Sequence, residues 1–186
     1  LLLPLVMAID DVGRLGAALR LTAIPGTIGS GLVSVYAPRF AREWAGGLRR
    51  RLAGSLRETQ MWMLALYAPF GVVFVLVPEA LVSLLGPEFE GTATAIRILG
   101  VGQAVSAFAG TGVVFLSMCR QERFALAATT LAVVAGSAVA LVGGSGWGIT
   151  GASFGYAVVL GATNVATLVW AHVGVLRRMP VLPPAT

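Results

Sequence analysis

Arginines gather in every second gap between the long apolar stretches of this chain. The arginine-rich gaps are residues 39–58, residues 119–123 and the tail from Arg177. The gaps that alternate with them are 10–14, 79–97 and 143–149, and they hold five of the eight acids. Cytoplasmic loops of multi-pass membrane proteins carry the excess of Arg and Lys. The alternation therefore predicts a protein that crosses the membrane several times, with its basic gaps in the cytoplasm.

The composition agrees with a membrane protein. Hydrophobic residues form 57% of the chain and charged residues only 11%, whereas a soluble domain has about 25% charged residues. The net charge of +5 could suggest nucleic acid as a partner, but the arginines are confined to short gaps beside apolar stretches. That placement fits anionic lipid head groups. We therefore expect membrane lipids as partners and no nucleic acid.

Five stretches are long enough to cross a bilayer, which takes about 20 apolar residues. They are residues 15–38, 59–78, 98–118, 124–143 and 150–176. Backbone groups in hydrocarbon must pair internally, and these stretches lack the alternation of barrel strands, so helices are expected. The predicted fold is an all-α membrane helix bundle in the bacterial cytoplasmic (inner) membrane. Its C-terminus lies in the cytoplasm.

The first nine residues are too few to span a bilayer. We interpret residues 1–9 as the outer end of a helix whose first half is lacking, and the chain as the C-terminal part of a larger protein. A signal peptide would have a basic start and a small-residue cleavage site, which this segment does not show.

Residues 40–57 carry an apolar residue at every fourth position. The positions are Phe40, Trp44, Leu48, Leu52 and Leu56, and the arginines lie off this stripe. Such a pattern predicts an amphipathic helix in the head-group plane, with its arginines on anionic lipid. Gly46 and Gly47 would weaken the middle of that helix. The alternative is a solvated connector.

Glycines are abundant within the apolar stretches. Gly151 and Gly155 form a GxxxG pattern, which allows membrane helices to approach closely. We expect these glycines to pack within one bundle rather than to form a dimer. Pro25 and Pro69 lie inside predicted spans and favour kinks.

Three polar residues at membrane depth are the candidate substrate-binding residues: Arg20, Gln103 and Asn164. Polar groups at this depth are costly and are functional by default. Arg20 would lie about 8 Å below the outer boundary, where it could also reach the head groups by snorkelling. Facing inward, Arg20 would suit a diphosphate, because guanidinium pairs with phosphate in a bidentate manner. Gln103 and Asn164 could instead bond across helices.

No catalytic constellation is visible in the sequence. His172 is the single histidine, so a His pair or a His-based metal cluster is excluded. The sequence contains no P-loop, dinucleotide fingerprint or nucleophile elbow. We expect a protein that is not an enzyme and that has no cofactor and no metal.

Several segments resemble, in order, the C-terminal lobe of polysaccharide and lipid-linked oligosaccharide flippases. They are Ala18-Leu19-Arg20-Leu21 with Pro25-Gly26, Tyr36-Ala37-Pro38-Arg39-Phe40, Leu84-Leu85-Gly86-Pro87-Glu88-Phe89-Glu90 with Ala95-Ile96-Arg97-Ile98-Leu99, Cys119-Arg120-Gln121-Glu122-Arg123, and Trp147-Gly148-Ile149-Thr150-Gly151-Ala152. These flippases belong to the multidrug/oligosaccharidyl-lipid/polysaccharide exporter superfamily. The resemblance covers essentially the whole chain.

The resemblance implies two six-helix lobes around a central cavity, with alternating access by rocking of the lobes. This chain would be most of the second lobe, and the N-terminal lobe of the same protein would be its partner. The implied substrate is an undecaprenyl-diphosphate-linked glycan, carried from the cytoplasmic to the outer leaflet. In the related lipid II flippases, the arginine that matches Arg20 faces the cavity and is needed for activity.

Two other functions stay open. A cation-coupled multidrug exporter of the same superfamily would be expected to hold an acid at membrane depth, and the five apolar stretches contain none. A membrane scaffold of a glycan-synthesis complex would transport nothing. A scaffold would tolerate the loss of Arg20, whereas a transporter should not.

Overall fold

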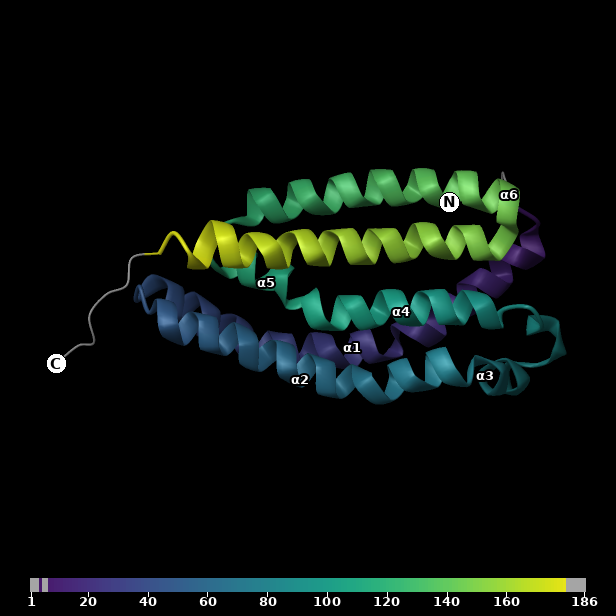
Figure 1. The fold of residues 1–186 in the computed structure, drawn as a ribbon, viewed down its shortest axis with the longest axis horizontal. Helices are drawn as coiled ribbons and strands as arrows, with labels where there is room; N and C mark the ends of the chain where they lie inside the picture. The colour runs from purple at the N-terminus through teal and green to yellow at the C-terminus, as the bar shows by residue number, and fades with distance from the viewer. Residues whose placement is uncertain (1–3, 5–6, 180–186) are drawn as a thin grey trace.

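The computed structural model describes residue 4 and residues 7–179, and it is helical nearly throughout this part of the chain. Its elements are α1 (Ile9–Ala45), α2 (Arg49–Leu76), α3 (Pro78–Leu85), the 3-10 turn η2 (Pro87–Phe89), α4 (Ala93–Ala109), α5 (Thr111–Met118), α6 (Glu122–Trp170) and the π-helical η3 (Ala171–Leu176). The described residues contain no strand. The long helices run side by side as one elongated bundle (Figure 1).

Four helical segments are long and apolar enough to cross a membrane: α1, α2, α4 with α5, and α6 with η3. The last of these has 55 residues and reverses direction, so it supplies two antiparallel arms, 122–147 and 149–176. The prediction of an all-α bundle with several long apolar helices is confirmed for the described residues. These helices are those of a multi-pass membrane protein.

The reversal in α6 occurs at Gly148. Its backbone has φ 55° and ψ −134°, a left-handed conformation that glycine adopts without steric cost. Small residues hold the two arms together. A Cβ on Gly143 would lie 2.9 Å from Gly151 Cα, and Gly155 packs in the same way against Ala140. The expectation that Gly151 and Gly155 pack within the chain is confirmed.

The prediction of one amphipathic helix over residues 40–57 is wrong. α1 continues to Ala45, the chain turns through Gly46 and Gly47, and α2 begins at Arg49. Gly47 has φ 66°, so the pair of glycines breaks the helix and does more than weaken it. Most of the apolar stripe is covered by protein: Phe40, Leu52 and Leu56 belong to a core cluster that includes residues of α5 and η3, Trp44 packs against it, and Leu48 at the turn is exposed.

The expected helix end at residues 1–9 falls largely outside the described residues. Within the described part, Met7 and Ala8 precede α1 and are not helical. The first predicted span lies inside α1, which is longer at both ends. Pro25 and Pro69 lie inside the continuous helices α1 and α2. The second predicted span, 59–78, lies almost wholly inside α2, which starts earlier and ends at Leu76; α3 then begins at Pro78, a residue suited to the first turn of a helix.

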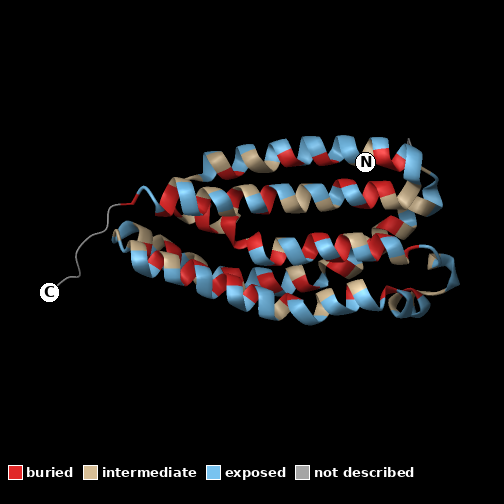
Figure 2. Ribbon diagram, viewed as in Figure 1, coloured by how far each residue is buried: buried red, intermediate tan, exposed pale blue. Residues whose placement is uncertain are grey.

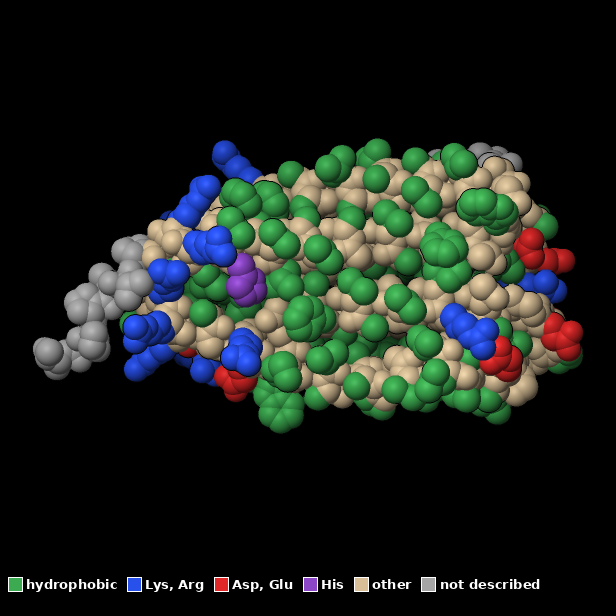
Figure 3. Space-filling model, viewed as in Figure 1, with side chains coloured by type: hydrophobic (Ala, Val, Ile, Leu, Met, Phe, Trp, Pro, Cys, Tyr) green, Lys and Arg blue, Asp and Glu red, His purple; other side chains and the backbone are tan. Residues whose placement is uncertain are grey.

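Two core clusters mark the two ends of the bundle. At the basic end, Phe40, Leu52 and Phe115 pack with Val175 and Leu176, which brings together the α1–α2 turn, the α5–α6 turn and the start of the tail. At the other end, Ala18 packs with Phe74, Val82, Ile96 and Leu99. Arginines gather near the first end and acids near the second (Figure 3).

α4 occupies the centre of the bundle, where it packs against α1, α2 and α6. Buried residues lie on the faces where helices meet, and exposed residues cover the outer faces (Figure 2). Many of the exposed residues are large and apolar, for example Leu126, Leu131 and Val142. An apolar outer surface of this kind suits lipid better than water.

Candidate functional site

Two hollows follow one another along the bundle between α1 and the second arm of α6. The first, of about 250 Å³, lies between Leu15 and Leu19 of α1 and Tyr156 and Val159 of α6. The second, of about 440 Å³, is lined further along the same two helices, with Asn164 on the α6 side. We call the first the apolar hollow, the second the polar hollow, and the pair the α1–α6 groove.

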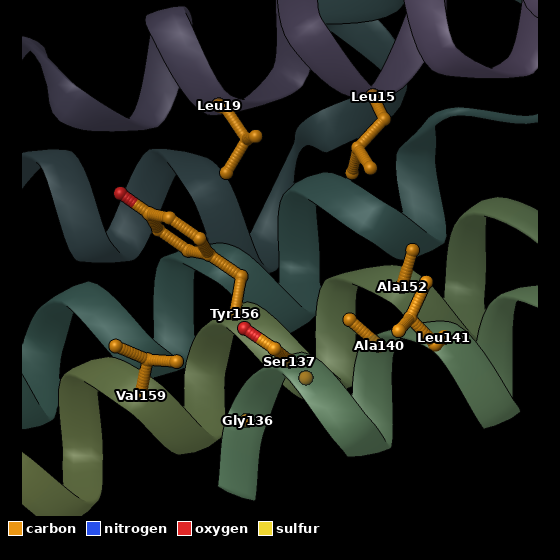
Figure 4. A pocket seen from close by; sticks show the side chains of 10 residues that line it. Leu15, Leu19, Gly136, Ser137, Ala140, Leu141, Ala152, Tyr156 and Val159 are labelled. Carbon is orange, nitrogen blue, oxygen red and sulfur yellow. The ribbon is translucent and has the colours of Figure 1, made fainter. Parts of the chain in front are cut away.

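The apolar hollow is shown in Figure 4. Leu19 extends from α1 toward Tyr156, Leu15 extends toward Ala152, and Ser137 and Ala140 come from the first arm of α6. Among its lining side chains only Ser137 and Tyr156 carry a polar atom. The surface is therefore suited to hydrocarbon, and it contains no group that could bind an ion strongly.

The polar hollow is lined by residues from each of the four helical segments that are long and apolar enough to cross a membrane. Its polar lining residues are Ser30 and Ser34 of α1, Tyr67 of α2, Gln103 and Ser106 of α4, and Asn164 of α6. None of these side chains is an acid or a base, so the hollow offers hydroxyl and amide groups without net charge. Such groups act as both donors and acceptors of hydrogen bonds.

The interruption between α4 and α5 lies at this hollow. α4 ends at Ala109, Gly110 lines the hollow, and α5 is displaced from the axis of α4 (Figure 1). α5 instead lies close to α6, where a Cβ on Gly112 would be 2.7 Å from Thr167 Oγ1. Discontinuous membrane helices leave backbone groups available at depth, and they are tolerated where they line a cavity.

Asn164 lies near the middle of the second arm of α6. It follows the bend at Gly148 by about 24 Å and precedes the end of η3 at Leu176 by about 18 Å along the helix axis. In a hydrocarbon core of about 30 Å, Asn164 is therefore far from both surfaces. Gln103 and Asn164 are 7% and 8% exposed, so both are shielded from lipid as polar residues at this depth must be.

The structure brings Gln103 and Asn164 together in the polar hollow but places Arg20 elsewhere. Arg20 is exposed and lines neither hollow. Among the described residues it takes part in no hydrogen bond or ion pair between side chains. It follows Leu19 directly, but successive side chains of a helix point about 100° apart, so Arg20 is turned away from the lining of the apolar hollow.

An exposed polar stripe runs along α1 from Arg20. Thr27 and Ser34 follow at intervals of seven residues, which places them on nearly the same side of the helix, and all three are exposed. Ser30 lies beside them and donates a hydrogen bond to Thr27 O at 2.7 Å. Ser34 donates to Ser30 O at 2.8 Å. Ser30 and Ser34 also line the polar hollow, so the stripe meets the α1–α6 groove there.

Sequence reasoning identified Gln103 and Asn164 but missed Ser30, Ser34, Tyr67 and Ser106. Single serines and tyrosines are common in apolar helices and give no individual signal. The available signal was spacing: Ser30 and Ser34 lie one turn apart, as do Gln103 and Ser106.

The described residues offer no metal site. No group of three His, Cys, Asp or Glu side chains lies close enough together in the described part of the chain. His172 is exposed, and its Nδ1 lies 3.0 Å from Leu168 O. No protein family matches this chain, and neither a curated protein nor a solved structure does. The resemblance to exporters therefore stays a prediction, and the site is interpreted from its chemistry.

Proposed function

We propose that this protein is a non-enzymatic membrane transporter and that the α1–α6 groove lines its substrate path. The proposed cargo is a lipid-linked oligosaccharide or polysaccharide precursor, moved from the cytoplasmic to the outer leaflet. One observation carries the proposal: an uncharged polar hollow at mid-depth and an apolar hollow follow one another along the same pair of helices. A lipid-linked glycan has a polar part, the sugar, and an apolar part, the hydrocarbon chain, which match the polar and the apolar hollow.

The polar hollow suits a glycan because its lining matches sugar hydroxyls. The side chains of Gln103, Ser106 and Asn164 offer donors and acceptors without a fixed charge. An uncharged lining holds a neutral sugar by several weak bonds, so the cargo can also leave. The volume of about 440 Å³ lies in the range of small-molecule sites.

Arg20 is proposed to contact the diphosphate that joins lipid to glycan. It is exposed on the polar stripe of α1, one position after Leu19 of the apolar hollow. A charged residue at membrane depth avoids lipid and faces a cavity or another protein surface. We therefore propose that a second lobe faces this stripe and that the substrate path lies between them.

The drug-exporter alternative is less well supported by the described residues. A cation-coupled exporter would be expected to hold an acid at membrane depth. None of the five predicted spans contains Asp or Glu, although the N-terminal lobe could supply one. Glu58 and Glu79 adjoin the two ends of the second predicted span, where they pair with Arg39 and Arg97. The scaffold alternative makes a different prediction from transport in the experiment that follows, because a scaffold would tolerate the loss of Arg20.

The test uses the complete gene in a bacterium that lacks its own flippase and makes a glycan of the accepted class. Surface glycan is measured for the wild type, for Arg20→Ala and for Arg97→Ala, at equal membrane levels of protein. Arg97 is the matched control, because it pairs with Glu79 of α3 at 2.7 Å near the start of α4 and lines neither hollow. We expect the wild type and Arg97→Ala to restore the glycan and Arg20→Ala to fail. Full restoration of the surface glycan by Arg20→Ala would show that Arg20 does not take part in the substrate path. If the wild type restores no glycan, the drug-exporter and scaffold functions are favoured instead.

A further inference from the structure

The turn between α1 and α2 encloses a third hollow, of about 480 Å³, at the basic end of the bundle. It is lined by Arg39, Arg42 and Glu43 of α1, Leu48 of the turn and Arg51 of α2. None of these residues lines the α1–α6 groove. We call this hollow the arginine cleft, and it requires an explanation of its own.

The walls of the arginine cleft are held in place by Glu43. This glutamate is 8% exposed, and its Oε1 accepts hydrogen bonds from Arg39 Nε at 3.1 Å and from Ser55 Oγ of α2 at 3.0 Å. The backbone N–H of Leu48 donates to Glu43 O at 2.9 Å. Both helices and the turn are therefore fixed to one residue, so the cleft is formed before any ligand arrives.

The charges around the cleft do not cancel. Arg39 is shared between Glu43 and Glu58, at 3.1 Å from each. Arg42 and Arg51 form no ion pair with any other described residue. The lining itself holds three guanidinium groups and one carboxylate, and Glu58 lies outside it, so the cleft carries an excess of positive charge.

The excess positive charge attracts an anion. Oε2 of Glu43 is buried and has no hydrogen-bond partner among the described residues, so this part of the wall is negative and an anion would lie against Arg42 and Arg51 instead. Guanidinium groups bind phosphate through paired hydrogen bonds. A phosphodiester carries a single negative charge and keeps the oxygens that such bonds need.

The cleft also lies where lipid head groups would be. Trp62 on α2 is 57% exposed and follows Glu58 by about one turn, or 6 Å. Exposed tryptophans are enriched at the membrane interface. Arg39, which is paired with Glu58, is then at the level of the lipid phosphates, and the cleft opens beside it. We infer that the arginine cleft binds the phosphodiester head group of an anionic lipid, with Arg42 and Arg51 as its principal contacts.

The experiment uses the complete protein, purified in detergent and studied by native mass spectrometry. Phosphatidylglycerol is the probe, phosphatidylcholine is the zwitterionic comparison, and inorganic phosphate is the soluble comparison. The double variant Arg42→Gln/Arg51→Gln removes the two contacts. Its matched control is Arg120→Gln/Arg123→Gln, which removes the same charge at the same end of the bundle and outside the cleft.

We expect phosphatidylglycerol to bind the wild type in preference to phosphatidylcholine. The cleft variant should lose about tenfold in affinity, the effect of removing a pair of charge-assisted hydrogen bonds, and the control should stay within about twofold of the wild type. Arg42→Lys/Arg51→Lys keeps the charge without the paired geometry, and it should bind with intermediate affinity. Circular dichroism establishes that each variant is folded.

Three results would overturn the inference. An equal loss in the control would show general attraction to a basic surface. Equal binding of phosphatidylcholine would show that the anionic charge is not recognised. Displacement of the lipid by inorganic phosphate at millimolar concentration would show a site for soluble phosphate instead of a head-group site.

Discussion

The side-chain amide of Asn164 on α6 donates a hydrogen bond of 2.8 Å to the hydroxyl of Ser106 on α4. The two residues are far apart in the sequence, and both line the polar hollow. Two groups that would each be costly in hydrocarbon thus satisfy one another. The bond joins the central helix to the second arm of α6 at the depth where the proposed cargo would pass.

The strength of this bond can be measured with a double-mutant cycle. Asn164→Ala and Ser106→Ala should each lower the free energy of unfolding, and the coupling between them should be about 0.6 kcal/mol, the average for hydrogen bonds between membrane helices. Unfolding of the purified protein in increasing SDS provides the four free energies. Strictly additive effects would mean that the bond contributes nothing to stability.

The single cysteine should be unreactive in the folded protein. Cys119 is buried just beyond the end of α5, and burial raises the pKa of its thiol to about 12. Because only the thiolate reacts, a maleimide at pH 7.5 should label the protein in denaturant and leave the native protein unlabelled.

A surface cysteine provides the control for this experiment. Arg123→Cys in a Cys119→Ala background places the thiol at an exposed position close to the same turn, and it should be labelled rapidly under native conditions. Rapid native labelling of Cys119 itself would show that the cluster around Phe40 and Phe115 is open in solution.

Close packing between the two arms of α6 predicts that alanine substitution will lower stability at one glycine of the first arm and not at another. Gly143→Ala would bring a Cβ to 2.9 Å from Gly151 Cα, whereas Gly146→Ala on the same arm meets no atom within 4 Å. Gly143→Ala should therefore cost about 1–3 kcal/mol of stability, as overpacking does. Gly146→Ala should cost almost nothing in the same SDS titration. Equal stability of the two variants would contradict the packing of the arms.

Much of the fold follows from charge and hydropathy, because these act over whole segments. The alternating arginines predicted which gaps meet at one end, and Phe40, Phe115 and Val175 do form one cluster there. The amphipathic pattern after Phe40 misled, because a period of four residues does not reveal whether lipid or protein covers the stripe. The helix is interrupted at Gly47, whose backbone has a positive φ, and this local conformation cannot be predicted from the apolar pattern.

The groove was only partly predictable. Gln103 and Asn164 could be selected singly, because polar groups at membrane depth are costly. That they share a hollow depends on how α4 and α6 are rotated about their axes and on the displacement of α5 from α4, which no single residue encodes. Ser106 gave no signal of its own. Arg20 was also selected, but it lies on the exposed stripe outside the lining of the hollow.

The most direct test of the proposed function is transport by the complete protein in proteoliposomes. A fluorescent undecaprenyl-diphosphate-linked oligosaccharide is placed in the membrane, and its movement between leaflets is followed by quenching from outside. The variant Gln103→Leu/Asn164→Leu removes the amides of the polar hollow. Ser117→Leu is the control, because Ser117 is an exposed polar residue of α5 that does not line the hollow.

We predict that the wild type and Ser117→Leu move the lipid at similar rates. The groove variant should be slower by about tenfold or more, since it loses hydrogen bonds to the glycan that together contribute more than about 1.4 kcal/mol. Equal rates for the groove variant and the control would contradict the assignment of the α1–α6 groove as the substrate path. Absence of transport by the wild type would contradict the proposed function itself.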